Sequence, residues 1–121
     1  MVRDLHGPQR RRAGAKAADT TLEDPKAKVR RWAVHSIACE PCKEGEHPMD
    51  VVPLLAKRLK EDKSIKVRRT AALSLLQWAT DKRVRRLLRG ILDSEDDMKI
   101  QRYANWGLKR PELFDRRAGA V

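Results

Sequence analysis

Lys66-Val67-Arg68-Arg69-Thr70-Ala71-Ala72-Leu73-Ser74-Leu75-Leu76 is a segment that the chain carries three times in altered form. Its relatives occupy residues 28–37 upstream and residues 99–108 downstream. The equivalent residues Val29, Val67 and Ile100 recur at spacings of about 38 and about 33 positions, which is typical of helical repeat arrays. The repetition therefore predicts an all-α fold built from stacked units.

Small and apolar side chains follow each of these anchor residues at helical spacing. In the first copy they lie at i, i+4, i+7 and i+8, as Val29, Ala33, Ser36 and Ile37. Asp24 followed by Pro25 predicts the start of this helix, and residues 39–48 break the period and predict a loop. We expect one further helix before each later copy, over residues 50–60 and about 84–92.

The order of residue types in each copy resembles the HEAT repeat, an antiparallel helix pair that stacks with its neighbours. An Asp stands five residues before the anchor Val in the first two copies, an Arg follows the Val directly, and an Ala follows four residues after it. The resemblance covers about residues 22–110 and implies a short right-handed α-solenoid of about two and a half hairpins. A four- or five-helix bundle is the alternative, although a bundle does not require a common period.

In HEAT repeats the turn Asp and the following Arg form a ladder that links adjacent units. The resemblance carries this role to Asp24 with Arg30 and to Asp62 with Arg68. The third copy has Glu95 at the acidic position and Gln101 at the basic one, a departure that we interpret as the end of the ladder. Open stacking faces make self-association an expected property.

The net charge of +11 at pH 7 indicates a negatively charged partner. We expect residues 1–21 to form a basic, flexible arm that includes Arg10, Arg11 and Arg12, and residues 111–121 to form a tail after the repeats at 22–110. No apolar run approaches the length of a membrane span, so we expect a cytoplasmic protein.

The outward face of the repeated helices is the first candidate site. Helical geometry places Arg31, Arg69 and Arg102 in a row along the concave surface that the resemblance implies. The other positions predicted to point outward are His35, Ala38, Leu73, Leu76, Trp106 and Lys109. Such a row suits an acidic protein surface or, together with the basic arm, the phosphates of a nucleic acid. The competing interpretation is that the arginines only solvate the helices and that Trp106 packs on Phe114.

Two functional classes follow from this face. The first is a non-catalytic interaction scaffold, and the second is a DNA, RNA or ribonucleoprotein binder. HEAT-like alkylpurine DNA glycosylases use a basic concave surface on duplex DNA, but no acidic residue here matches a catalytic role. An enzyme resembling the HEAT-like bilin lyases is a third and weaker interpretation, so we expect no enzyme.

Two cysteines and two histidines form the second candidate site, which is His35, Cys39, Cys42 and His47. Two thiolates across a turn with two imidazoles nearby suit tetrahedral zinc. The loop resembles the Cys-containing insertion of some short bacterial HEAT-repeat proteins. A redox pair, or an ordinary buried thiol at Cys39, are the alternatives. The acidic run at residues 94–97 lacks the closing ligands of a calcium loop and predicts helix capping instead.

Overall fold

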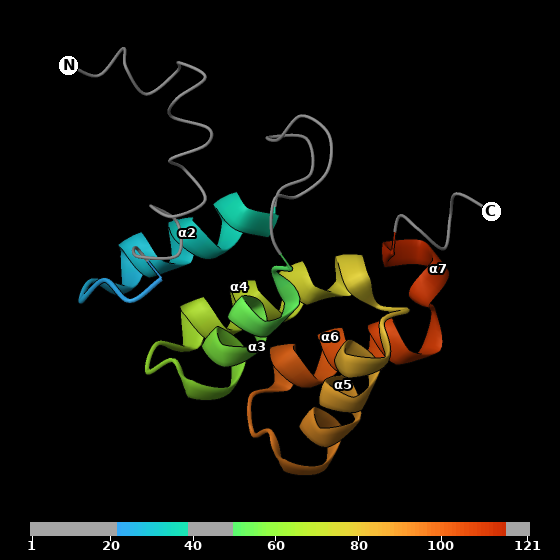
Figure 1. Cartoon of the computed structure of the whole chain (residues 1–121). Coiled ribbons are helices and arrows are strands. Elements are labelled where there is room, and N and C mark those ends of the chain that lie inside the picture. The colour runs from blue at the N-terminus through green and yellow to red at the C-terminus, as the bar shows by residue number, and fades with distance from the viewer. Residues whose placement is uncertain (1–21, 39–49, 116–121) are drawn as a thin grey trace.

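The computed structural model describes residues 22–38 and 50–115, and within these ranges every regular element is helical (Figure 1). The elements are α2 (Ala27–Ala38), α3 (Val52–Glu61), α4 (Ile65–Leu75), the 3-10 turn η2 (Leu76–Trp78), α5 (Lys82–Ser94), α6 (Met98–Lys109) and α7 (Pro111–Phe114). None of the described helices is long and apolar enough to cross a membrane.

Acidic and hydroxyl side chains fix where the helices begin. The Ser64 hydroxyl accepts a hydrogen bond from the Val67 amide, and Asp97 accepts one from the Ile100 amide. Each of these contacts satisfies an amide that the first turn of a helix leaves without a partner. The first helix differs from the prediction: Asp24 accepts from the Lys26 amide at 2.8 Å, and α2 begins at Ala27.

The helices form two layers, with α2, α4 and α6 in one and α3 and α5 in the other (Figure 1). α4 packs against α2, α3 and α6, and α5 packs against α6, so the hairpins α3–α4 and α5–α6 each contribute one helix to each layer. A bundle around one shared axis would bring α2 and α6 to a common core, whereas here α4 separates them. The arrangement is the predicted short all-α solenoid.

Leucine, valine, isoleucine and alanine make the core between the layers, as the low aromatic content of the sequence requires. The largest fully buried apolar side chains are Leu55, Leu75, Leu76, Leu88, Ile100, Val34, Val67 and Val84. Gly107 lies where α6 meets this core. A Cβ atom at that position would lie 2.6 Å from Leu76 Cδ2 and 2.8 Å from Leu88 Cδ1, so the small residue is required by close approach of the helices.

Four predictions about side-chain direction need correction. Ala38 and Leu76, expected to point outward, are buried; each follows by four residues another buried residue, Val34 or Ala72, so the buried side of these helices is wider than expected. Val29, expected to be buried, is half-buried. The positions of Trp32 and Trp78 in related second helices of the sequence predict packing between repeats. Trp78 does pack against the core, whereas Trp32 is 55% exposed.

The segment after the third repeat is packed rather than tail-like as far as Asp115. Phe114 stacks on Trp106 with ring centroids 6.1 Å apart and an angle of 8° between the ring planes. The Asp115 carboxylate is buried and accepts hydrogen bonds from the Thr80 amide at 2.8 Å and from the Thr80 hydroxyl at 2.6 Å. α7 therefore fastens the end of the third hairpin to the turn that follows η2.

Candidate binding surface

The repeats are joined by arginine–carboxylate pairs that run from one unit to the next. Arg30 of α2 donates two hydrogen bonds to Asp62, from Nε at 2.8 Å and from Nη2 at 2.9 Å. The same guanidinium donates to the backbone carbonyl of Asp24 at 2.8 Å, so it ties its own turn to the following unit. The carboxylate partner of Arg30 is thus Asp62 rather than Asp24, because the ladder reaches forward by one repeat.

Asp62 is the most enclosed acidic residue of this ladder. Its side chain has no exposed surface, and a second arginine, Arg58, lies 3.2 Å away at a side-chain exposure of 9%. Burial alone would raise the pKa of Asp62. The hydrogen bonds from Arg30 and from the Ser64 amide outweigh that effect, so the pKa lies below its ordinary value.

The second joint repeats the plan with different residues. Arg68 donates to Glu95 at 2.7 Å, so its carboxylate partner is Glu95 of the third unit rather than Asp62. Gln101 occupies the arginine position of that unit and donates to the backbone carbonyl of Glu95, as Arg30 does to Asp24. Gln101 keeps the hydrogen bond within its own turn, but it has no charge that could pair with a carboxylate of a further unit. This agrees with the interpretation that the ladder ends at the third repeat.

Arg69, the middle arginine of the predicted row, is engaged in a second pair across the same joint. It donates from Nε to Asp97 at 3.1 Å and from Nη2 at 2.7 Å, in the parallel geometry that suits a guanidinium and a carboxylate. The hydrogen bonds from Arg69 lower the pKa of Asp97 to about 2. The row therefore contains a neutralised pair at its centre instead of a free cation.

Arg31 and Arg102, the outer members of the row, are exposed. Neither guanidinium has an ion pair or hydrogen bond within residues 22–38 and 50–115. Arg31 lacks the counterpart of the Arg69–Asp97 pair, because Ser64 stands in the second repeat where Asp97 stands in the third. His35 and Lys109 are exposed on the same set of helices, as predicted.

Large apolar side chains are exposed beside these cations. Trp32 is 55% exposed, Leu73 is 47% exposed and Trp106 is 41% exposed. Trp106 lies against Tyr103, with ring centroids 5.8 Å apart, as well as against Phe114, so the predicted contact with Phe114 is present while one part of the indole stays accessible. The face thus combines apolar area with arginine.

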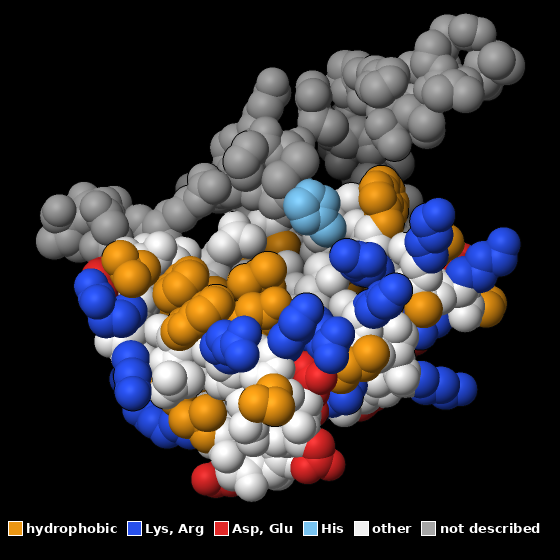
Figure 2. Space-filling model, turned by 180° about the vertical axis from the view of Figure 1, so that it is seen from behind, with side chains coloured by type: hydrophobic (Ala, Val, Ile, Leu, Met, Phe, Trp, Pro, Cys, Tyr) orange, Lys and Arg blue, Asp and Glu red, His pale blue; other side chains and the backbone are white. Residues whose placement is uncertain are grey.

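Figure 2 shows this side of the molecule, from behind the view in which α3 and α5 lie in front. Hydrophobic side chains gather on one half of this surface, and Lys and Arg side chains lie beside them and across its middle. We use the name second-helix face for the exposed residues of α2, α4 and α6 that form the candidate site, which are Arg31, Trp32, His35, Leu73, Arg102, Trp106 and Lys109.

Part of the sequence prediction falls outside the described residues. Arg10, Arg11 and Arg12 lie there, and so do the candidate metal ligands Cys39, Cys42 and His47. His35, the remaining candidate ligand, is on α2 and exposed. Within the ranges that the structure describes, no three His, Cys, Asp or Glu side chains gather as a metal site would require. The zinc hypothesis stays a prediction from the sequence.

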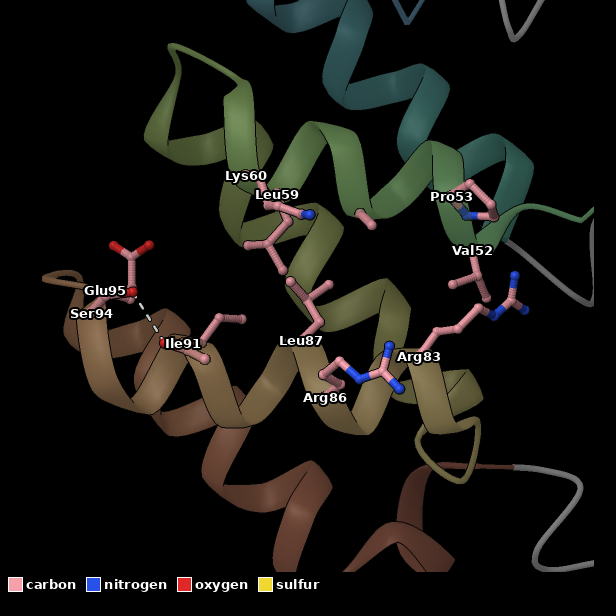
Figure 3. A pocket seen from close by; sticks show the side chains of 12 residues that line it. Val52, Pro53, Leu59, Lys60, Arg83, Arg86, Leu87, Ile91, Ser94 and Glu95 are labelled. Atoms are coloured by element: carbon pink, nitrogen blue, oxygen red, sulfur yellow. Dashed lines mark hydrogen bonds between the residues drawn. The ribbon is translucent and has the colours of Figure 1, made fainter.

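A hollow that the sequence reasoning missed lies on the other layer, between α3 and α5 (Figure 3). It has a volume of about 630 Å³ and is lined by apolar residues of both helices, with Lys60, Arg83 and Arg86 at its edges. The sequence feature that could have indicated this hollow is Gly90. It stands in the middle of a helix, where the repeat pattern does not call for a glycine.

The chain was compared with known protein families, curated proteins and solved structures. The family model described as HEAT repeats matches residues 15–109. No curated protein and no solved structure matches the chain. The matched region contains every residue of the second-helix face and both joints of the ladder.

Proposed function

Because the chain belongs to the HEAT-repeat family, we propose that it is a non-catalytic binding module whose second-helix face recognises an acidic surface of a partner protein. HEAT repeats generally mediate protein interactions or act as scaffolds, and the family is typically non-catalytic. The observation that carries the proposal is the exposure of Trp32, Leu73 and Trp106 on the helices that also present Arg31 and Arg102.

The physical argument rests on what such a mixture can bind. Exposed apolar side chains gathered on one face lose contact with water when a partner covers them, and this is the main driving force of association. Tryptophan and arginine are also the residue types that most often dominate the energy of protein interfaces. Two accessible guanidinium groups would then orient carboxylates of the partner.

The nucleic-acid alternative is less well supported by the same face. Phosphate binding requires cations that are free to replace counterions. The central arginine of the row, Arg69, already holds Asp97, which places a carboxylate where a phosphate would have to approach. Leu73, which lies on the same helix, offers no group that phosphate can use. These contacts favour a protein partner.

The test compares two charge-reversal pairs with the same change in net charge. Arg31→Glu with Arg102→Glu alters the second-helix face, whereas Lys82→Glu with Arg89→Glu alters exposed residues of α5 in the other layer. Proteins that co-purify with the wild type from its own cells should be lost about tenfold or more in the first pair and retained in the second. Equal retention by both variants would contradict the proposal.

Nucleic acid binding is measured on the same proteins. Purified wild type should show little retention on duplex DNA or single-stranded RNA at low salt. If it is retained, and if the affinity falls steeply with salt and drops in the Arg31→Glu, Arg102→Glu pair, the face belongs to a nucleic-acid binder instead.

A further inference from the structure

The groove between α3 and α5 is separate from the second-helix face, because it lies on the opposite layer of the solenoid (Figure 3). Figure 3 places Val52, Pro53 and Arg83 at one end of the groove and Lys60 and Glu95 at the other. The two helices therefore run in the same direction along its walls. A helix rises about 1.5 Å per residue, so the stretch from Val52 to Lys60 makes a groove about 12 Å long.

Small residues keep the middle of the groove open. Ala56 on α3 and Gly90 on α5 both line it, while Leu59 and Leu87 supply larger apolar side chains on its walls. A Cβ atom added at Gly90 would have no atom within 4 Å, in contrast to Gly107, where two leucines stand in the way. Nothing in the fold itself requires a glycine at this position.

A glycine inside a helix has a measurable cost. It lowers helix stability by about 1 kcal/mol relative to alanine, because the unfolded chain gains freedom. Gly107 offsets this cost by allowing α6 to approach the core, but Gly90 makes no such contact. A glycine that the fold does not need, at the middle of an apolar groove, is accounted for if another chain must approach the backbone closely there.

The charges at the edges of the groove identify the chemistry of that chain. Arg83 is already held by Asp50 and Asp81, and Glu95 is held by Arg68. Lys60 and Arg86 are exposed on opposite walls, and neither has an ion pair among the residues that the structure describes. The unsatisfied charges around the groove are thus both positive.

We propose that this groove binds an amphipathic helical segment of a partner protein, with apolar side chains directed at Gly90 and acidic side chains facing Lys60 and Arg86. Such a segment presents anchors at i, i+3, i+4 and i+7, which is how helices occupy apolar grooves. A second copy of this chain is a poor occupant, because α2, α4 and α6 contain no acidic residue and α3 and α5 contain one each, Glu61 and Asp93.

The experiment uses Gly90→Leu, which places a side chain into the groove without disturbing packed atoms. Its thermal unfolding should occur at or above the wild-type temperature, because leucine is a better helix former than glycine. A displayed library of helix-forming peptides of about 14 residues, long enough for about four turns, is selected on the wild type and then tested on both proteins.

The expected result is a set of selected peptides with acidic residues beside a helical apolar stripe, which lose at least about tenfold in affinity for Gly90→Leu. Arg86→Glu should weaken them by a similar factor, while Arg89→Glu, one turn away and outside the groove, should leave them within about twofold. Arg31→Glu with Arg102→Glu should also leave them unchanged, so failure of this inference is distinguishable from failure of the proposed function.

Three outcomes would overturn the proposal. The first is that no wild-type-selected peptide discriminates against Gly90→Leu, or that the discriminating peptides carry basic instead of acidic flanks. The second is a concentration-dependent dimer that Gly90→Leu abolishes, which would assign the groove to a second copy. The third is binding to anionic phosphatidylserine vesicles that Gly90→Leu abolishes, which would assign it to a membrane surface.

Discussion

At the scale of single residues, Asp62 is the carboxylate on which two arginines from different helices converge. Arg30 approaches it from the preceding repeat and Arg58 from its own hairpin. Both arginines are largely enclosed. Removal of the negative charge leaves Arg30 without its carboxylate and leaves Arg58 with only the exposed Glu23, 3.4 Å away. The joint between the first two repeats therefore depends on one side chain.

We expect Asp62→Asn to lower the free energy of unfolding by about 2–4 kcal/mol, because breaking one partner of a buried pair strands the other. Urea unfolding followed by far-UV circular dichroism measures the loss. Asp96→Asn is the matched control, since Asp96 is exposed and has no pair in the described part of the chain. Equal losses in the two variants would show that the ladder does not stabilise the fold.

The lowered pKa of Asp97 predicts how stability depends on pH. A carboxylate whose folded pKa lies below its ordinary value contributes stability that is present above the ordinary value and is lost as pH falls through the folded pKa. For Asp97, with an ordinary pKa of 3.8 and a folded pKa of about 2, the loss should fall between about pH 4 and about pH 2. Asp62, whose pKa is also lowered, adds to the loss in the same direction.

Acid titrations of the urea midpoint test this linkage. The wild type should lose stability more steeply between about pH 4 and about pH 2 than Asp97→Asn does, because the amide cannot titrate. A variant curve parallel to that of the wild type would show that the pairing of Asp97 with Arg69 contributes nothing to folding.

At the scale of elements, the two helical glycines give opposite predictions for the same substitution. Gly107→Ala should destabilise by about 1–3 kcal/mol, because its Cβ atom forces two buried leucines, Leu76 and Leu88, out of place. Gly90→Ala should stabilise by about 0.5–1 kcal/mol through helix propensity alone. Thermal unfolding of both variants decides the matter, and shifts of the same sign would contradict the packing described at Gly107.

A buried carboxylate at the end of the short helix α7, that of Asp115, fastens it to Thr80 in addition to the stacking of Phe114 on Trp106. We expect Asp115→Ala to cost about 1–3 kcal/mol, because the Thr80 amide and hydroxyl both lose the acceptor that the buried Asp115 carboxylate supplies. Glu112→Ala, on an exposed turn of α7, should cost little, since its pair with Arg110 is on the surface. Hydrogen exchange at the turn after η2 should rise in the first variant alone.

The elements also show what periodicity can and cannot predict. The repeat register places Gly107 beside Ser36 and Ser74 in one alignment, which is why close approach at this position was predictable. Ala38 and Leu76 were misplaced because the predicted buried stripe was too narrow. Val34 and Ala72, four residues earlier, are also fully buried, since these helices pack against neighbours in both layers or in adjacent repeats.

The pairing of Arg69 shows a different limit. A helical wheel gives the direction of Arg69 correctly but contains no information on the residue that the next repeat brings opposite to it. Asp97 reaches it because the cap of α6 lies at the joint between units, a distance of 28 positions in sequence. The groove between α3 and α5 escaped prediction for the same reason, since its walls belong to different repeats.

At the scale of the whole molecule, α4 is the helix that holds both layers together, since it contacts α2, α3 and α6. A defect on its buried side should therefore unfold the complete array instead of one repeat. Ala71→Asp places a charge at a fully buried site, at a cost of several kcal/mol that is comparable with the roughly 5–10 kcal/mol stability of a small domain.

Leu73→Asp is the matched control for that defect, because it introduces the same side chain on the exposed side of the same helix. Circular dichroism should show loss of helix for Ala71→Asp and a native signal for Leu73→Asp. A native, cooperatively unfolding Ala71→Asp variant would be incompatible with α4 as the shared core helix.

The third hairpin forms a charged pair with the preceding repeat, but it cannot form one with a following repeat, because Gln101 stands at the arginine position. A duplicate of the second hairpin inserted ahead of α5 would find a guanidinium and a carboxylate facing each other at both new seams. The same duplicate grafted after Lys109 would meet only an amide. A longer array is thus favoured when repeats are inserted between the existing ones. Growth beyond the third unit would require the substitution Gln101→Arg.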